Sequence, residues 1–116
     1  MNTSEWKDTI RPFIWVEHDE EASVCLTPGT YKAALFSTRA KEGFEGNGYD
    51  WASLAEQFLH QHLPKIQNSI MFDPEAEMFC AYSSDKDALR TFITAFKDAC
   101  DDDTVIQEVF STIELD

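Results

Sequence analysis

The chain has 116 residues, of which 43% are hydrophobic and 13% aromatic; this is enough apolar material for one folded core and excludes an intrinsically disordered protein. Twenty-two acidic residues against nine basic ones give a formal net charge of −13. Such a charge repels DNA, RNA and anionic lipid surfaces and attracts a basic protein, although solubility alone is an alternative explanation for it.

The predicted elements form two similar halves. Residues 1–11 are polar and are expected to be loosely held, with docking of Trp6 as an alternative. After them, β-branched and aromatic runs predict strands, and apolar residues three and four apart predict helices. The predicted strands cover Pro12–His18, Ser23–Thr27, Ser69–Asp73 and Glu77–Ser83, and the predicted helices cover Tyr31–Arg39, Trp51–Leu63, 85–100 and Thr104–Thr112. The order ββαα-ββαα predicts an α+β fold, with an antiparallel sheet built from two hairpins and helices packed on one face, in a single domain over residues 1–116.

A glycine-rich loop separates the first two predicted helices. The stretch "GFEGNGYDW" (Gly43–Trp51) holds three of the four glycines of the chain. Glycine and Asn47 tolerate positive φ, so we expect a sharp turn into the following helix, with Asp50 as its N-cap. Tyr49 stands where it would complete a hydrophobic staple, and Phe44 is expected to pin the loop to the core. Two roles remain open for the loop, a structural connector and a binding surface.

The loop lacks the pattern of a phosphate-binding loop. It follows a predicted helix, no lysine comes after its last glycine, and the carboxylates of Glu42, Glu45 and Asp50 would oppose an anion. The histidines do not indicate a metal site either, because His60 and His62 diverge on a helix and the third lies in an acidic hairpin tip. We therefore predict no catalytic residue, no metal site and no cofactor.

An acidic run, Asp101–Asp103, separates the last two predicted helices. Asp103 is predicted to cap the final helix, as Thr30 and Ser84 are predicted to cap earlier ones. For the run as a whole, an acidic corner in solvent, a partner-facing patch and a metal site are alternative interpretations.

The chain has three cysteines, Cys25, Cys80 and Cys100. Their odd number and wide spacing predict neither a disulfide framework nor a zinc site, so we expect reduced and mostly buried thiols. The first residues lack the basic and apolar runs of a signal peptide, and no apolar stretch approaches the roughly 18 residues that span a bilayer. A cytoplasmic location without membrane association is expected.

Four stretches carry a resemblance to a known family: "RPFIWVEH" (Arg11–His18), "GFEGNGYDWASLA" (Gly43–Ala55), "FDPEAEMFCAYSSDKDAL" (Phe72–Leu89) and "FSTIELD" (Phe110–Asp116). From about Arg11 to Asp116 the chain resembles the immunity protein 51 family of bacterial polymorphic toxin systems. The G-x-G-Y-D-W core, Gly46–Trp51, is the most specific part. The resemblance implies a small cytoplasmic α+β protein that binds and neutralises a toxin, and it implies no catalytic residues.

Charge and resemblance together indicate a protein partner. Opposite charge raises association rates, so we expect a cognate toxin with a basic surface, such as a nuclease. The expected contact residues belong to the glycine loop and the acidic run: Glu42, Phe44, Glu45, Tyr49, Asp50, Asp101 and Asp102. The protein is expected to be a monomer. A small acidic adaptor or regulatory domain and a metal-dependent hydrolase remain as alternative functions.

Overall fold

The computed structural model describes residues 3–114, so residues 1–2 and 115–116 of the predicted domain lie outside it. Its sheet has four antiparallel strands: β1 (Ile14–Glu17), β2 (Ala22–Leu26), β3 (Met71–Phe72) and β4 (Phe79–Ser83). The spatial order is β1-β2-β4-β3. Each hairpin joins neighbouring strands, and the pairing of β2 with β4 joins the two hairpins into one sheet.

Five α-helices accompany the sheet: α1 (Thr3–Thr9), α2 (Ala33–Ser37), α3 (Gly48–His62), α4 (Lys86–Cys100) and α5 (Asp103–Ser111). Two short 3₁₀ helices, η1 (Ala40–Glu42) and η2 (Gln67–Ser69), lie between them. The predicted α+β fold and its ββαα-ββαα order are confirmed, with α1 as an additional first element. Within residues 3–114, no helix combines the length and the apolar composition needed to cross a bilayer.

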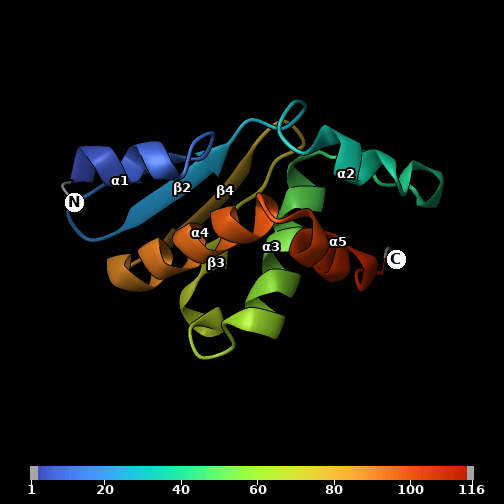
Figure 1. The fold of residues 1–116 in the computed structure, drawn as a ribbon. Helices are drawn as coiled ribbons and strands as arrows, with labels where there is room; N and C mark the ends of the chain where they lie inside the picture. Colours follow the sequence, from blue (N-terminus) through green and yellow to red (C-terminus); the bar gives the residue numbers. More distant parts are fainter. Residues whose placement is uncertain (1–2, 115–116) are drawn as a thin grey trace.

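The helices cover one face of the sheet. Along β2 and β4 the buried residues alternate with partly exposed ones, as expected when one face packs on a core and the other does not. In Figure 1, α1 lies at one end of the molecule and α2 and α5 lie at the other, with α3 and α4 in the middle. We call the uncovered side of the sheet the open face.

Helix α1 differs from the expectation of a loosely held segment over residues 1–11. Trp6 and Ile10 stand four residues apart, which places them on one side of a helix, and they are 5% and 0% exposed. The Trp6 indole N–H donates a hydrogen bond to Thr94 Oγ1 of α4 at 3.0 Å, and its ring meets the edge of the Trp15 ring. The alternative, in which Trp6 docks on the rest of the fold, is therefore confirmed.

Trp51 of α3 lies at the centre of an aromatic core. Its side chain is fully buried, and its ring contacts those of Phe13 and Phe96 edge-on, with centroids 5.8 and 6.0 Å apart. The Tyr31 ring stacks on it at 5.9 Å. Large aromatic rings bury much apolar area, so this cluster anchors the start of α3, and with it the glycine loop, to the core.

Candidate partner-binding surface

The glycine loop packs directly on the connection between β3 and β4. The backbone N–H of Gly48 donates to the carbonyl of Ala76 at 3.0 Å. A Cβ atom added at Gly48 would lie 1.8 Å from the carbonyl oxygen of Glu75 and 2.3 Å from that of Met78. Two segments nearly 30 residues apart in the chain are thus in backbone contact, which only glycine permits.

This contact brings together an exposed set of side chains that we call the loop–turn surface: Glu45, Tyr49, Glu75, Glu77 and Met78. Tyr49 is 54% exposed and Met78 is 38% exposed. The ion pairs found among the described residues include none of the three glutamates, so their negative charge is not neutralised by a neighbouring lysine or arginine. The surface therefore combines exposed apolar groups with uncompensated carboxylates.

A shallow hollow of about 430 Å³ lies beside this surface. Its walls come from the segment that follows β2, from the glycine loop and from the β3–β4 connection, including Pro28, Glu45 and Glu77. The backbone of the connection is itself closed by reciprocal hydrogen bonds between Glu75 and Met78, at 2.8 and 3.1 Å. The carboxylates thus stand on a shaped and internally bonded support, which limits the ordering cost of binding.

The predicted N-cap of α3 was wrong. Helix α3 begins at Gly48, and the Asn47 side chain accepts the capping hydrogen bond from the Asp50 N–H at 2.9 Å. Asp50, 7% exposed, instead accepts the backbone N–H groups of Glu45 and Gly46 on one carboxylate oxygen, at 2.7 and 2.8 Å. Asp50 therefore fixes the loop from inside.

The turn residues were predicted in part. Gly43 and Gly46 have φ values of 110° and 72°, as expected, whereas Asn47 has a φ of −85° because it serves as the cap. Tyr49 lies within the first turn of α3 and points to solvent, so the predicted hydrophobic staple does not form. Its exposure makes Tyr49 available to a partner.

Phe44 and Glu42 are held by Arg39. The Phe44 ring is 3% exposed and packs on the Phe110 ring, with centroids 4.8 Å apart, so the expectation that it pins the loop is confirmed. The Arg39 guanidinium lies 4.6 Å from the centre of the Phe44 ring and donates two 2.8 Å hydrogen bonds to the Glu42 carboxylate. These hydrogen bonds lower the pKa of Glu42. Phe44 is not accessible to a partner protein, and the Glu42 carboxylate is already paired with Arg39.

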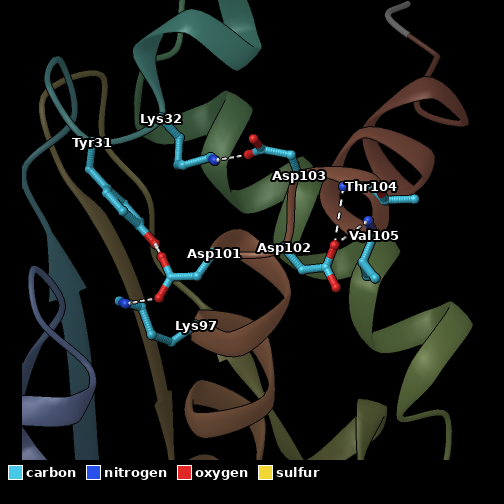
Figure 2. A network of polar contacts seen from close by, with 8 residues as sticks. All are labelled: Tyr31, Lys32, Lys97, Asp101, Asp102, Asp103, Thr104 and Val105. Atoms are coloured by element: carbon cyan, nitrogen blue, oxygen red, sulfur yellow. Dashed lines mark hydrogen bonds and ion pairs between the residues drawn. The ribbon is translucent and has the colours of Figure 1, made fainter.

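The acidic run joins three parts of the fold (Figure 2). Asp101 accepts hydrogen bonds from the Tyr31 hydroxyl at 2.7 Å and from Lys97. Asp102 is the N-cap of α5, so the predicted Asp103 cap was wrong; Asp103 instead pairs with Lys32 at 3.0 Å. The predicted Thr30 and Ser84 caps were likewise wrong, since Lys32 and Asp85 occupy those positions. The run thus has a structural role at the α4–α5 junction.

The Tyr31–Asp101 contact predicts a change at alkaline pH. Burial and then the hydrogen bond to Asp101 raise the pKa of Tyr31 well above its ordinary value. Above about pH 10 the unfolded chain therefore releases this proton while the folded chain keeps it, so stability falls as the pH rises. Tyr31→Phe should flatten this fall in urea unfolding between pH 9 and 11. An unchanged slope would contradict the assignment, and Tyr49→Phe, at an exposed position, is the matched control.

Sequence reasoning missed Glu75, Glu77 and Met78. The backbone contact at Gly48 brings them to the loop. The available signal was the concentration of glycines, which was interpreted as a sharp turn and does not identify the segment that packs against it. Among the side chains of the described residues, no group of three or more His, Cys, Asp or Glu is arranged to hold a metal ion.

Comparison with known proteins identifies one family. The sequence model of Immunity protein 51 matches residues 13–115, a range that covers every helix and strand except α1. No curated protein and no solved structure matches the chain.

Proposed function

The chain belongs to the immunity protein 51 family, and from this premise we propose that it binds a cognate bacterial toxin in the cytoplasm and neutralises it by covering the toxin's active or substrate-binding surface. In this proposal the protein acts as a single-domain monomer. Two copies, each with a formal net charge of −13, repel one another, whereas a basic toxin is attracted.

We place the toxin contact on the loop–turn surface. The observation that carries this assignment is the set of three carboxylates without ion pairs, Glu45, Glu75 and Glu77, around the exposed Tyr49 and Met78 side chains. Aromatic side chains and methionine are enriched at the centres of protein interfaces, and a polar rim surrounds them. A basic cleft on the toxin, such as one that binds the phosphates of nucleic acid, is the complementary surface.

Of the residues expected from the sequence, Glu45 and Tyr49 stay in the proposed interface. Phe44 and Asp50 are excluded by their burial. Of the remaining three, Glu42 and Asp101 form ion pairs with Arg39 and Lys97, and Asp102 caps α5. The Glu45 carboxylate accepts a hydrogen bond from the neutral Asn47 amide, which leaves its charge unpaired. The proposed interface therefore retains two of the seven contact residues that were expected from the sequence.

Co-expression with candidate toxin domains from the neighbouring genes tests the proposal. The wild-type chain should restore growth and co-purify with the toxin domain. The triple variant Glu45→Lys/Glu75→Lys/Glu77→Lys should lower the association rate constant by about 10- to 100-fold and weaken its dependence on salt, because electrostatic steering is lost. Stopped-flow mixing at several salt concentrations measures both.

The matched control is Glu20→Lys/Glu21→Lys/Glu108→Lys, which changes the net charge equally at three exposed positions in the β1–β2 turn and on α5, outside the loop–turn surface. Equal association rates for the two triple variants would remove the loop–turn surface from the interface. Failure of the wild-type chain to rescue growth would overturn the toxin-neutralising function itself and favour the adaptor alternative.

A further inference from the structure

Cys25 and Cys80 face each other across the two central strands. They are directly paired in the antiparallel register of β2 and β4, and their sulfur atoms lie 2.7 Å apart. The residues on either side of them, such as Val24 and Ala81, are buried under the helices. Because side chains alternate along a strand, both cysteines lie on the open face of the sheet.

The open face gives small molecules access to this pair. Cys25 and Cys80 are both partly exposed, which differs from the buried thiols expected from the sequence, whereas Cys100 is fully buried. Ile14, opposite Cys25 on β1, is 62% exposed, and Met71 on β3 is 50% exposed. The described residues thus place no helix over the two sulfur atoms.

We propose that Cys25 and Cys80 form an oxidisable dithiol, which a small-molecule disulfide such as glutathione disulfide converts into a cross-strand disulfide. Residues directly opposite in an antiparallel pair have Cα atoms about 4.5–5.5 Å apart, within the range that a disulfide bridges. Bond formation therefore requires no rearrangement of the sheet.

The reaction proceeds by two thiol–disulfide exchanges. The Cys25 thiolate attacks one sulfur of the small disulfide, forms a mixed disulfide and expels one small thiolate. Cys80 then loses its proton and attacks the Cys25 sulfur, which releases the second small thiolate. The two protons of the protein thiols end on the two small thiols, so the protein is oxidised by two electrons and the reagent is reduced by two.

The surroundings of Cys80 affect how readily its thiol loses a proton. Burial, and then the hydrogen bond and charge of Cys25, raise the pKa of the Cys80 thiol to about 12. A thiol that holds its proton more tightly is less available as a thiolate, so the proposal gives the first attack to Cys25 and the second to Cys80. Burial likewise raises the pKa of the Cys100 thiol, and its fully buried position keeps it from the reagent.

The disulfide would close a long loop between the two hairpins. Cys25 and Cys80 are separated by 55 positions, so the cross-link restricts the unfolded chain strongly. We expect the melting temperature of the oxidised protein to lie about 5–15 °C above that of the reduced protein.

Incubation of the purified protein with glutathione disulfide at pH 8 tests the proposal. Thiol counting should fall from three to one, the protein mass should fall by two hydrogens, and peptide mapping should find Cys25 linked to Cys80. Cys80→Ser should stop at a stable mixed disulfide on Cys25, and Cys100→Ala should still form the cross-link. Three unreacted thiols, a persistent mixed disulfide in the wild-type chain or a cross-link to Cys100 would each overturn the proposal.

Discussion

Replacing Gly48 with alanine should lower the free energy of unfolding by about 3–4 kcal/mol, near the upper end of what one added carbon atom costs. The added Cβ would lie 1.8 Å from the carbonyl oxygen of Glu75 and 2.8 Å from the carbonyl carbon of Met78. These are backbone atoms, held in place by the hydrogen bonds between Glu75 and Met78. The clash can be relieved only by lifting the loop from the β3–β4 connection, which also breaks the hydrogen bond from Gly48 to Ala76.

Gly29→Ala is the matched control because it separates steric clash from backbone strain. Gly29 has a φ of +119° and nothing within 4 Å of an added Cβ, so alanine there should cost about 1–2 kcal/mol through the backbone alone. Urea unfolding followed by tryptophan fluorescence measures both. A loss at Gly48 no larger than that at Gly29 would refute the close contact between loop and connection.

The role of Gly48 could not be predicted from the sequence. The glycines of the loop were explained by the sharp turn, and this explanation holds for Gly43 and Gly46, which have positive φ. Gly48 lies in the first turn of α3 and is needed for a different reason, the approach of a distant backbone. Nothing near Gly48 in the sequence identifies the residues that it approaches.

The strands and long helices could be predicted because their patterns are local. In β2, the alternation of Ala22, Val24 and Leu26 with polar or sulfur-bearing residues matches the buried and open faces of the sheet. Helix α1 was missed because it is seven residues long and mostly polar. Its only strong signal, the apolar pair Trp6 and Ile10, is too short to define a periodic pattern.

The same distinction applies to the candidate surface. The glycine loop was identified, and Glu45 and Tyr49 are exposed on it, but for Phe44 and Asp50 the sequence left both a structural role and a partner-facing role open, and their burial decides for the structural one. Phe44 is buried because Arg39 and Phe110 enclose it. Burial of this kind depends on which elements meet in space, which the spacing of residues in the loop does not encode.

Asp50→Ala should lower the free energy of unfolding by about 3 kcal/mol. One carboxylate oxygen of Asp50 accepts the backbone N–H groups of Glu45 and Gly46, at 2.7 and 2.8 Å, and the alanine variant leaves both donors without it. Hydrogen bonds to a charged acceptor contribute about 1.5–3 kcal/mol each, and the effects of two bonds to one oxygen are not additive. Urea unfolding at neutral pH measures the loss.

Asn47→Ala is the control for ordinary helix capping. Its side chain accepts one hydrogen bond at the start of α3 and donates one to the exposed Glu45 carboxylate, so its removal should cost about 1 kcal/mol. A larger loss of stability for Asn47→Ala than for Asp50→Ala would contradict the assignment of Asp50 as the residue that holds the loop.

The variants Asp50→Ala and Glu45→Lys together separate an effect on folding from an effect on binding. Under conditions in which Asp50→Ala is still folded, a toxin should associate with it more slowly only if the loop has lost its shape, since the buried carboxylate does not meet the partner. Glu45→Lys should show the opposite profile: little change in stability, because Glu45 is exposed, and a slower, less salt-dependent association. Normal stability of Asp50→Ala together with slow association would place Asp50 in the interface after all.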